Sequence, residues 1–205
     1  MSHYPLFIAM AMLLIILPGP DTALVTQNTL THSRKGGFRT ALGISTGILI
    51  HTLAAVLGIS AIIVKSAVLF SIFKYAGAVY LIYLGCMSLW STRKKGATRE
   101  EAPPYKGKSG FQQGFLTNLL NPKVAVFFLT FLPQFLDGGS NTFLQLLMMG
   151  LTYGVLTFAW FLMYIYLVDR INAWMKKPST QQWIGGVSGL VLIGFGVKLV
   201  LEKRQ

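Results

Sequence analysis

The sequence predicts an all-α membrane protein with about six transmembrane helices, and three observations support this fold class. Of the 205 residues, 53% are hydrophobic and 12% are charged, so the chain has too little polar surface to cover a water-soluble globule. The apolar runs are long and do not alternate, which favours spanning helices of ~20 residues over barrel strands of ~10. Lys and Arg gather between these runs, as they do in cytoplasmic membrane loops.

The apolar runs and the residues that interrupt them place the helices along the chain. We predict spans at 5–31, 38–64, 67–91, 112–136, 142–168 and 181–201. Only Lys65 and Ser66 separate the second and third spans, which predicts a tight helical hairpin. The segment 91–110 is rich in Lys, Arg, Gly and Pro and cannot bury a core. We therefore expect a basic cytoplasmic linker that joins two halves, 1–90 and 111–205, of a single transmembrane domain covering residues 1–205.

The distribution of basic residues predicts the orientation in the cytoplasmic (inner) membrane. Twelve of the 18 Lys and Arg residues lie in the first, third and fifth loops, so the positive-inside rule places both termini outside. The first half then begins outside and the second begins inside, which predicts two inverted three-helix repeats. We assign the formal net charge of +12 to these loops and to contacts with anionic lipids. Nucleic acid is not expected as a partner, because no nucleic-acid-binding motif is visible.

The first predicted span contains a break. Its sequence Pro18, Gly19, Pro20, Asp21 and Thr22 cannot maintain the helical hydrogen-bond ladder, because each proline removes a donor and restricts the backbone. Pro20 suits the first position of a new helix, so we expect a half-helix whose free amides and positive dipole end face the bilayer interior.

The fourth predicted span contains a comparable break. Asn118 and Asn121 precede Pro122 and Lys123, and Pro122 again suits a helix start. Non-helical backbone at this depth is tolerated only where protein or a water-filled cavity satisfies it, and matching breaks in two halves indicate a transporter's binding site. The alternative is that the prolines only kink packed helices.

Two ionisable side chains are predicted to lie inside the spans with a role in proton coupling. Asp21 is the only carboxylate deep within a span, where polar groups are expensive to keep. An acid that stabilises the start of the half-helix is its simpler interpretation. His51 follows Gly43 and Gly47 at four-residue spacing, so all three share one helix face that should meet another helix. A packed neutral histidine remains the alternative to a proton relay.

The remaining small and aromatic residues predict packing. Gly185 and Gly189 form a small-residue pair in the last span, and this spacing also allows a homodimer. Cys86 lies in an apolar run and is expected to be a small buried hydrophobe. Packing or interfacial positions, with one or two lining a cavity, are predicted for Tyr75, Tyr80, Tyr83, Tyr153, Tyr164 and Tyr166.

The polar residues argue against a membrane enzyme. Such an enzyme needs a nucleophile and a base, or a metal cluster, near the bilayer. His3, His32 and His51 do not have a metal-ligand spacing, and Asp21 has no second intramembrane carboxylate with which to divide acid and base roles. We expect no catalytic residue, no metal and no cofactor.

The two broken spans together resemble the LysE/RhtB family of amino-acid exporters. Hallmarks of that family are a Pro-Gly-Pro segment in the first helix and an Asn-Pro-Lys segment opening the fourth, present here at 17–21 and 121–123. Residues 132–135 and the glycine-rich final span agree in place, so the resemblance covers essentially the whole chain. It implies efflux of neutral amino acids or close derivatives, of the homoserine, threonine or leucine type, powered by the proton gradient.

These observations lead to a hypothesis of alternating access around a site between the two breaks. The amides after Pro20 or Pro122 receive the substrate carboxylate, and Asp21 binds the ammonium or the exchanged proton. Lys123 pairs with Asp21 in the empty site or with the substrate carboxylate. The alternative is a channel or a structural membrane protein that transports no amino acid. The predicted substrate-binding set is Pro18, Gly19, Pro20, Asp21, Thr22, Asn118, Asn121, Pro122 and Lys123.

Overall fold

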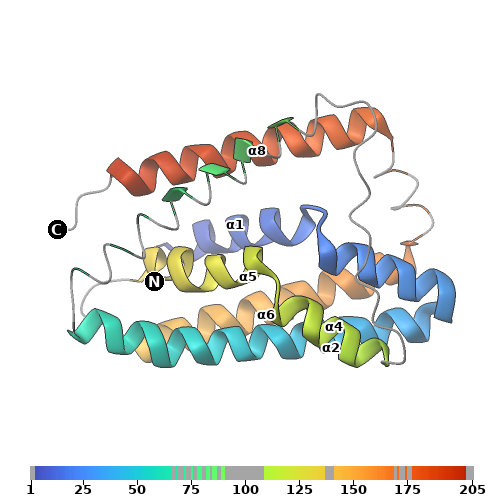
Figure 1. Ribbon diagram of the computed structural model, residues 1–205, viewed down its shortest axis with the longest axis horizontal. Helices are drawn as coiled ribbons and strands as arrows, with labels where there is room; N and C mark the ends of the chain where they lie inside the picture. Colours follow the sequence, from blue (N-terminus) through green and yellow to red (C-terminus); the bar gives the residue numbers. More distant parts are fainter. Residues whose placement is uncertain are drawn as a thin grey trace.

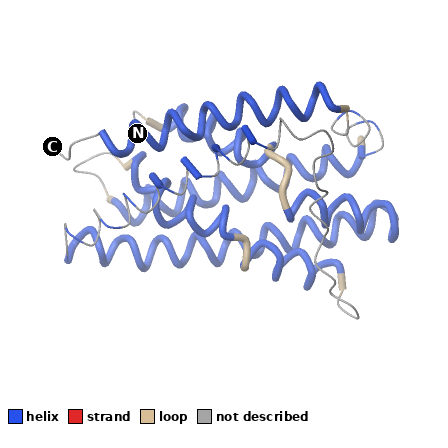
Figure 2. The backbone as a smooth tube through the Cα atoms, turned by 45° about the horizontal axis from the view of Figure 1, so that its top comes forward, coloured by secondary structure: helices blue, strands red, loops and turns tan. Residues whose placement is uncertain are grey.

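Helices make up all the regular structure in the described part of the chain (Figure 2). The computed structural model describes residues 3–65, 109–136, 141–168 and 177–201, together with individual residues between 68 and 90 and residues 170 and 174. The predicted linker lies almost wholly outside the described residues. So does much of the predicted third span, although its described residues are helical.

The helices follow one another as apolar rods of different lengths (Figure 1). Their bounds are α1 Tyr4–Ile16, α2 Pro20–Lys65, α4 Gly110–Leu119, α5 Pro122–Val126, α6 Thr142–Tyr166 and α8 Pro178–Leu201. Between α5 and α6 the chain forms a π-helical turn, η1 Phe127–Phe131, and a 3-10 turn, η2 Leu132–Phe135.

The described helices include segments of membrane-spanning length. By length and composition, Pro20–Gly58 and Thr142–Tyr166 are apolar enough to cross a bilayer, and α1 is a shorter apolar helix. The pair Gly110–Leu119 and Pro122–Phe135 also meets this test as one span that bends by 49° at the break. This is the architecture of an all-α membrane protein, as the sequence predicted. The predicted breaks in the first and fourth spans are confirmed.

The structure corrects the predicted loop between the first two spans. In place of a loop at 32–37, α2 is helical on both sides of His32 and Ser33, where Ser33 has a φ of 62°. The chain turns back at this point, so that the two arms of α2 lie against one another (Figure 1). Asn28 Nδ2 on the first arm donates to Thr40 Oγ1 on the second at 2.8 Å. The reversal therefore needs only the non-helical angles of two residues.

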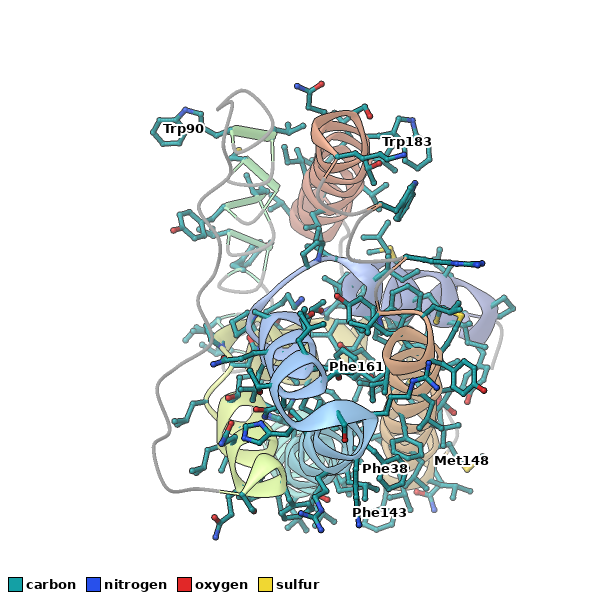
Figure 3. All side chains as sticks on the ribbon, turned by 90° about the vertical axis from the view of Figure 1, so that its right-hand side faces the viewer. Phe38, Trp90, Phe143, Met148, Phe161 and Trp183 are labelled. Carbon is teal, nitrogen blue, oxygen red and sulfur yellow. The ribbon has the colours of Figure 1, made fainter. Side chains whose placement is uncertain are left out.

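Large apolar side chains cover the outside of the described structure. Leu57, Val155 and Trp183 are each about 70% exposed, and Trp90 and Trp183 point outwards (Figure 3). Exposed apolar surface on this scale suits contact with lipid. The expectation for Cys86 was wrong, since its side chain is exposed. An apolar run in a membrane helix does not distinguish a core-facing position from a lipid-facing one.

Glycines allow the closest helix contacts. The face of α2 with Gly43 and Gly47 meets another helix, as predicted, and that helix is α4. A Cβ on Gly43 would lie 2.0 Å from the Phe111 carbonyl oxygen, and one on Gly47 would lie 2.7 Å from Asn118 Oδ1. On α8, a Cβ on Gly189 would lie 2.8 Å from the Gly85 carbonyl oxygen. Gly189 therefore packs against another segment of the same chain, and the homodimer stays a prediction.

Candidate functional site

The first helix break leaves the start of α2 facing into the protein. After α1 ends at Ile16, Pro20 occupies the first turn of α2, and the Ala23 amide donates to the Gly19 carbonyl oxygen at 2.9 Å. The amides of Asp21 and Thr22 precede this bond and have no intrahelical partner at that position. They lie at the positive end of the helix dipole, which favours negatively charged groups.

The second helix break has its own cap. Asn121 Oδ1 accepts a hydrogen bond from the Lys123 amide at 3.0 Å, and Pro122 occupies the first turn of α5. The side chain of Asn121 thus satisfies one of the free amides that the sequence analysis offered to a substrate. Of the two helix starts, the one at Pro20 leaves more of its amides for a bound anion.

Asp21 joins the two breaks. Its Oδ2 accepts hydrogen bonds from Asn118 Nδ2 at 2.8 Å and from Asn121 Nδ2 at 3.4 Å. His51 Nε2 donates to the backbone oxygen of Asn118 at 3.2 Å, so a histidine on α2 is linked to Asp21 through a single asparagine. Asn118 is fully buried and Asn121 is 3% exposed. The structure therefore gathers the polar residues that the sequence analysis selected from separate spans.

Lys123 contacts the end of α1. Its Nζ donates to the carbonyl oxygens of Leu14 and Leu17, each at 3.2 Å. These carbonyls belong to the last turn and C-cap of α1, where the missing next turn leaves them without helical partners and where a positive charge is favourable. The lysine therefore has a structural role that neither predicted pairing included.

We expect Lys123→Met to lower the free energy of unfolding by about 2 kcal/mol, because two carbonyls lose a charged donor. Thermal unfolding of the purified protein in detergent checks this. Lys123→Arg, which keeps the charge, should retain more of the stability. Unchanged stability in Lys123→Met, with transport lost, would assign the lysine to solute binding alone.

A small cavity lies between the breaks and α6, and its volume of about 20 Å³ has room for about one water molecule. Its lining is Leu14, Ile15, Gly19, Asp21, Thr22, Ile48, Asn118, Lys123, Val124, Tyr153, Thr157 and Phe161. Five of the predicted substrate-binding residues are among them. The other four, Pro18, Pro20, Asn121 and Pro122, are not in the lining and instead shape or brace the breaks.

Three oxygen atoms of the cavity residues are buried without a hydrogen-bond partner in the described structure. They are Asp21 Oδ1, Asn118 Oδ1 and Thr157 Oγ1. Buried polar atoms are nearly always paired, because an unpaired one loses its bond to water without replacement. Each of the three can accept a hydrogen bond, so together they favour a cationic or strongly donating ligand.

Helix α6 contributes the part of the site that the sequence analysis did not select. Tyr153, Thr157 and Phe161 follow one another at four-residue spacing and share a face. Phe161 is 2% exposed and points into the helix bundle (Figure 3). Tyr153 was one of several tyrosines considered for a cavity, whereas Thr157 and Phe161 were missed. The available signal was a hydroxyl at regular spacing between aromatic residues in an otherwise apolar span.

The described residues contain no group of three or more His, Cys, Asp or Glu placed to hold a metal ion. The chemistry that this part of the chain offers is hydrogen bonding, one carboxylate and one ammonium group around a small cavity.

Comparison with known proteins gives the family. A profile described as LysE type translocator matches residues 12–203. The chain belongs to the LysE type translocator family. This agrees with the resemblance seen in the two proline motifs. A LysE type translocator is a transport protein, so this chain is not an enzyme.

Several relatives align with this translocator over nearly their whole length. It is 36% identical to the uncharacterised membrane protein YrhP of Bacillus subtilis strain 168, over 96% of this chain and 97% of the relative. It is 32% identical to the threonine efflux protein of Escherichia coli K12, over 97% and 98%. It is 29% identical to the leucine efflux protein of Enterobacter sp. strain 638, over 94% and 92%. No solved structure matches the translocator.

Proposed function

We propose that this translocator exports neutral amino acids or close derivatives across the cytoplasmic membrane by proton antiport. The observation that carries this proposal is the hydrogen bond between Asp21 Oδ2 and Asn118 Nδ2, which joins two broken helices beside a cavity with unpartnered buried oxygens. The similarity to threonine and leucine efflux proteins supports an amino-acid substrate. A buried carboxylate in such a protein suits a cationic ammonium group or an exchanged proton.

The proposed architecture is a multi-pass protein with six spans in two inverted three-helix repeats. Residues 1–90 and 111–205 form the halves, the basic linker 91–110 lies in the cytoplasm and both termini lie outside. Support comes from the two breaks, which fall in the first span of each half and meet at Asp21. In inverted-repeat transporters, such breaks lie at the interface of the two repeats, near the membrane midplane.

We place the head group of the solute among the residues of the breaks. The free amides of Asp21 and Thr22 receive the carboxylate, since helix starts bind anions through their amides and dipole. Asp21 receives the ammonium or the exchanged proton. Lys123 lies in the same cavity and is the second group for the carboxylate. Rocking of the two halves about this point then exposes the site alternately to each side of the membrane.

His51 is the proposed second group in proton coupling. His51 Nε2 donates to the backbone oxygen of Asn118, and the side-chain amide of Asn118 donates to Asp21, so one asparagine positions both ionisable side chains. Histidine is the side chain whose ordinary titration range spans about pH 5 to 8, where a proton-driven exporter works.

We expect His51→Gln to weaken the pH dependence of efflux between about pH 5 and 8, because glutamine keeps a donor for Asn118 but does not titrate in this range. Initial efflux rates measured across this range check the prediction. His32→Gln is the matched control, since His32 is exposed at the reversal of α2. An unaltered pH profile in both variants would make His51 a packing residue.

The experiment that tests the function is efflux from cells preloaded with amino acids by dipeptide feeding. Cells with the translocator and cells with the empty vector are compared across a panel of amino acids, with and without an uncoupler. Selective, saturable efflux that the uncoupler abolishes supports a proton-driven exporter. Flux that neither saturates nor responds to the uncoupler would favour a channel, and no flux above the empty vector would remove amino acids as substrates.

A further inference from the structure

Most helical threonines in the described structure turn their hydroxyl to their own backbone. Seven of them donate to the carbonyl oxygen four residues earlier at 2.7–3.0 Å, namely Thr26, Thr29, Thr31, Thr40, Thr46, Thr52 and Thr130. This local bond satisfies the hydroxyl, although it slightly destabilises the helix. It is the ordinary state of a threonine in these helices.

Thr157 does not form this local hydrogen bond. The carbonyl of Tyr153 stands four residues before it on α6, yet the Thr157 hydroxyl has no hydrogen-bond partner in the described structure. The side chain is 4% exposed, so water does not substitute freely for the missing bond. The Thr157 side chain also lines the cavity. Its hydroxyl is therefore available to bond a molecule inside that cavity.

The composition of the cavity indicates which part of a solute reaches Thr157. The breaks supply Asp21, Asn118 and Lys123, the groups suited to the charged head of an amino acid. Helix α6 supplies the aromatic residues Tyr153 and Phe161 on either side of Thr157. Aromatic walls suit the body of a neutral side chain, and the hydroxyl between them can both donate and accept a hydrogen bond.

We propose that Thr157 is a specificity-determining residue whose hydroxyl bonds a hydroxyl group on the side chain of the transported amino acid. The translocator then prefers hydroxylated neutral amino acids to apolar ones of the same size. The preference arises because a solute without the hydroxyl leaves Thr157 buried and unpaired. This inference rests on the proposed export of amino acids.

The test pairs two isosteric solutes with two isosteric residues. Threonine and valine differ by a hydroxyl in place of a methyl group, and so do Thr157 and the variant Thr157→Val. Counterflow of radiolabelled L-threonine and L-valine is measured in proteoliposomes that contain the purified full-length protein. We expect Thr157→Val to lower the preference for threonine over valine about five- to tenfold, the size of one neutral hydrogen bond. Thr157→Ser should retain the preference.

Thr117→Val is the matched control. Thr117 on α4 is likewise buried, at 5% exposure, and its hydroxyl likewise has no partner in the described structure, but it is not in the cavity lining. Its substitution should leave the threonine-to-valine ratio unchanged.

The outcomes separate this inference from the proposed function. Counterflow of any amino acid by the unaltered protein supports export, whatever Thr157 does. An unchanged ratio in Thr157→Val, or an equal loss for threonine and valine, overturns the specificity role while leaving export in place. An equal change of the ratio in Thr117→Val would also overturn it, because the effect would not come from the cavity. No counterflow of any amino acid overturns both proposals.

Discussion

Asp21→Asn should reduce uncoupler-sensitive efflux to the level of cells with the empty vector, without removing the protein from the membrane. Asparagine has nearly the same size, and its oxygen can still accept from Asn118, so the link between the two breaks is kept. What is lost is the negative charge and the ability to bind and release a proton. Both are required if Asp21 alternates between the ammonium group and a proton.

The measurement is the initial rate of amino-acid efflux at matched levels of membrane protein, determined by immunoblot. Asp21→Glu is the companion variant, since it keeps the charge and moves it by one methylene. Wild-type rates and pH dependence in Asp21→Asn would contradict the transport role. Asp21 would then act only as the acid at the start of α2, where such a charge contributes about 0.3–1 kcal/mol.

The two breaks were predictable because their causes are local. A proline within a span removes its own hydrogen bond and clashes with the preceding turn, whatever surrounds it. The structure accordingly ends α1 before Pro18 and begins α2 and α5 at Pro20 and Pro122. The depth of Asp21 within an apolar run was likewise visible in the sequence, and it meets Asn118 because both breaks lie at the same level of the bundle.

The face that carries Gly43, Gly47 and His51 was predictable from four-residue spacing, but its partner was not. Periodicity identifies which residues of one helix share a side, whereas the neighbour depends on how the whole chain packs. In the structure that neighbour is α4, and His51 meets the backbone of Asn118. The matching breaks in two spans suggested that these residues lie close together. The hydrogen bonds between them could be identified only in the folded structure.

Other features of the structure depend on tertiary contacts that the sequence pattern does not reveal. The reversal of α2 uses a positive φ at Ser33, which is uncommon for a residue other than glycine and which serine does not signal. Lys123 bonds to two carbonyls of α1, more than 100 residues earlier in the chain. The hydroxyl of Thr157 has no partner in the described structure, whereas seven other helical threonines donate to their own backbone. Each of these follows from tertiary surroundings.

The tightest helix contact gives a prediction that tests the fold beneath the site. Gly43→Ala should destabilise the protein by about 2–3 kcal/mol, near the upper end of the range for overpacking. The added Cβ would lie 2.0 Å from the Phe111 carbonyl oxygen and 2.8 Å from the Phe115 amide nitrogen. Both atoms are backbone, so no side chain can rotate to make room. Thermal unfolding in detergent, followed by size-exclusion fluorescence, measures the loss.

Gly58→Ala is the control from the same helix, because a Cβ at Gly58 meets nothing within 4 Å. Alanine there should be neutral or stabilising by up to about 1 kcal/mol, since it restricts the unfolded chain and favours the helix.

Gly43→Ala should lower the rate of efflux as well as the stability, for a structural reason. Helix α4 must move away from α2, and that movement draws Asn118 from His51 and weakens the support of Asp21. Equal stability of the two variants would contradict this close packing of α2 on α4.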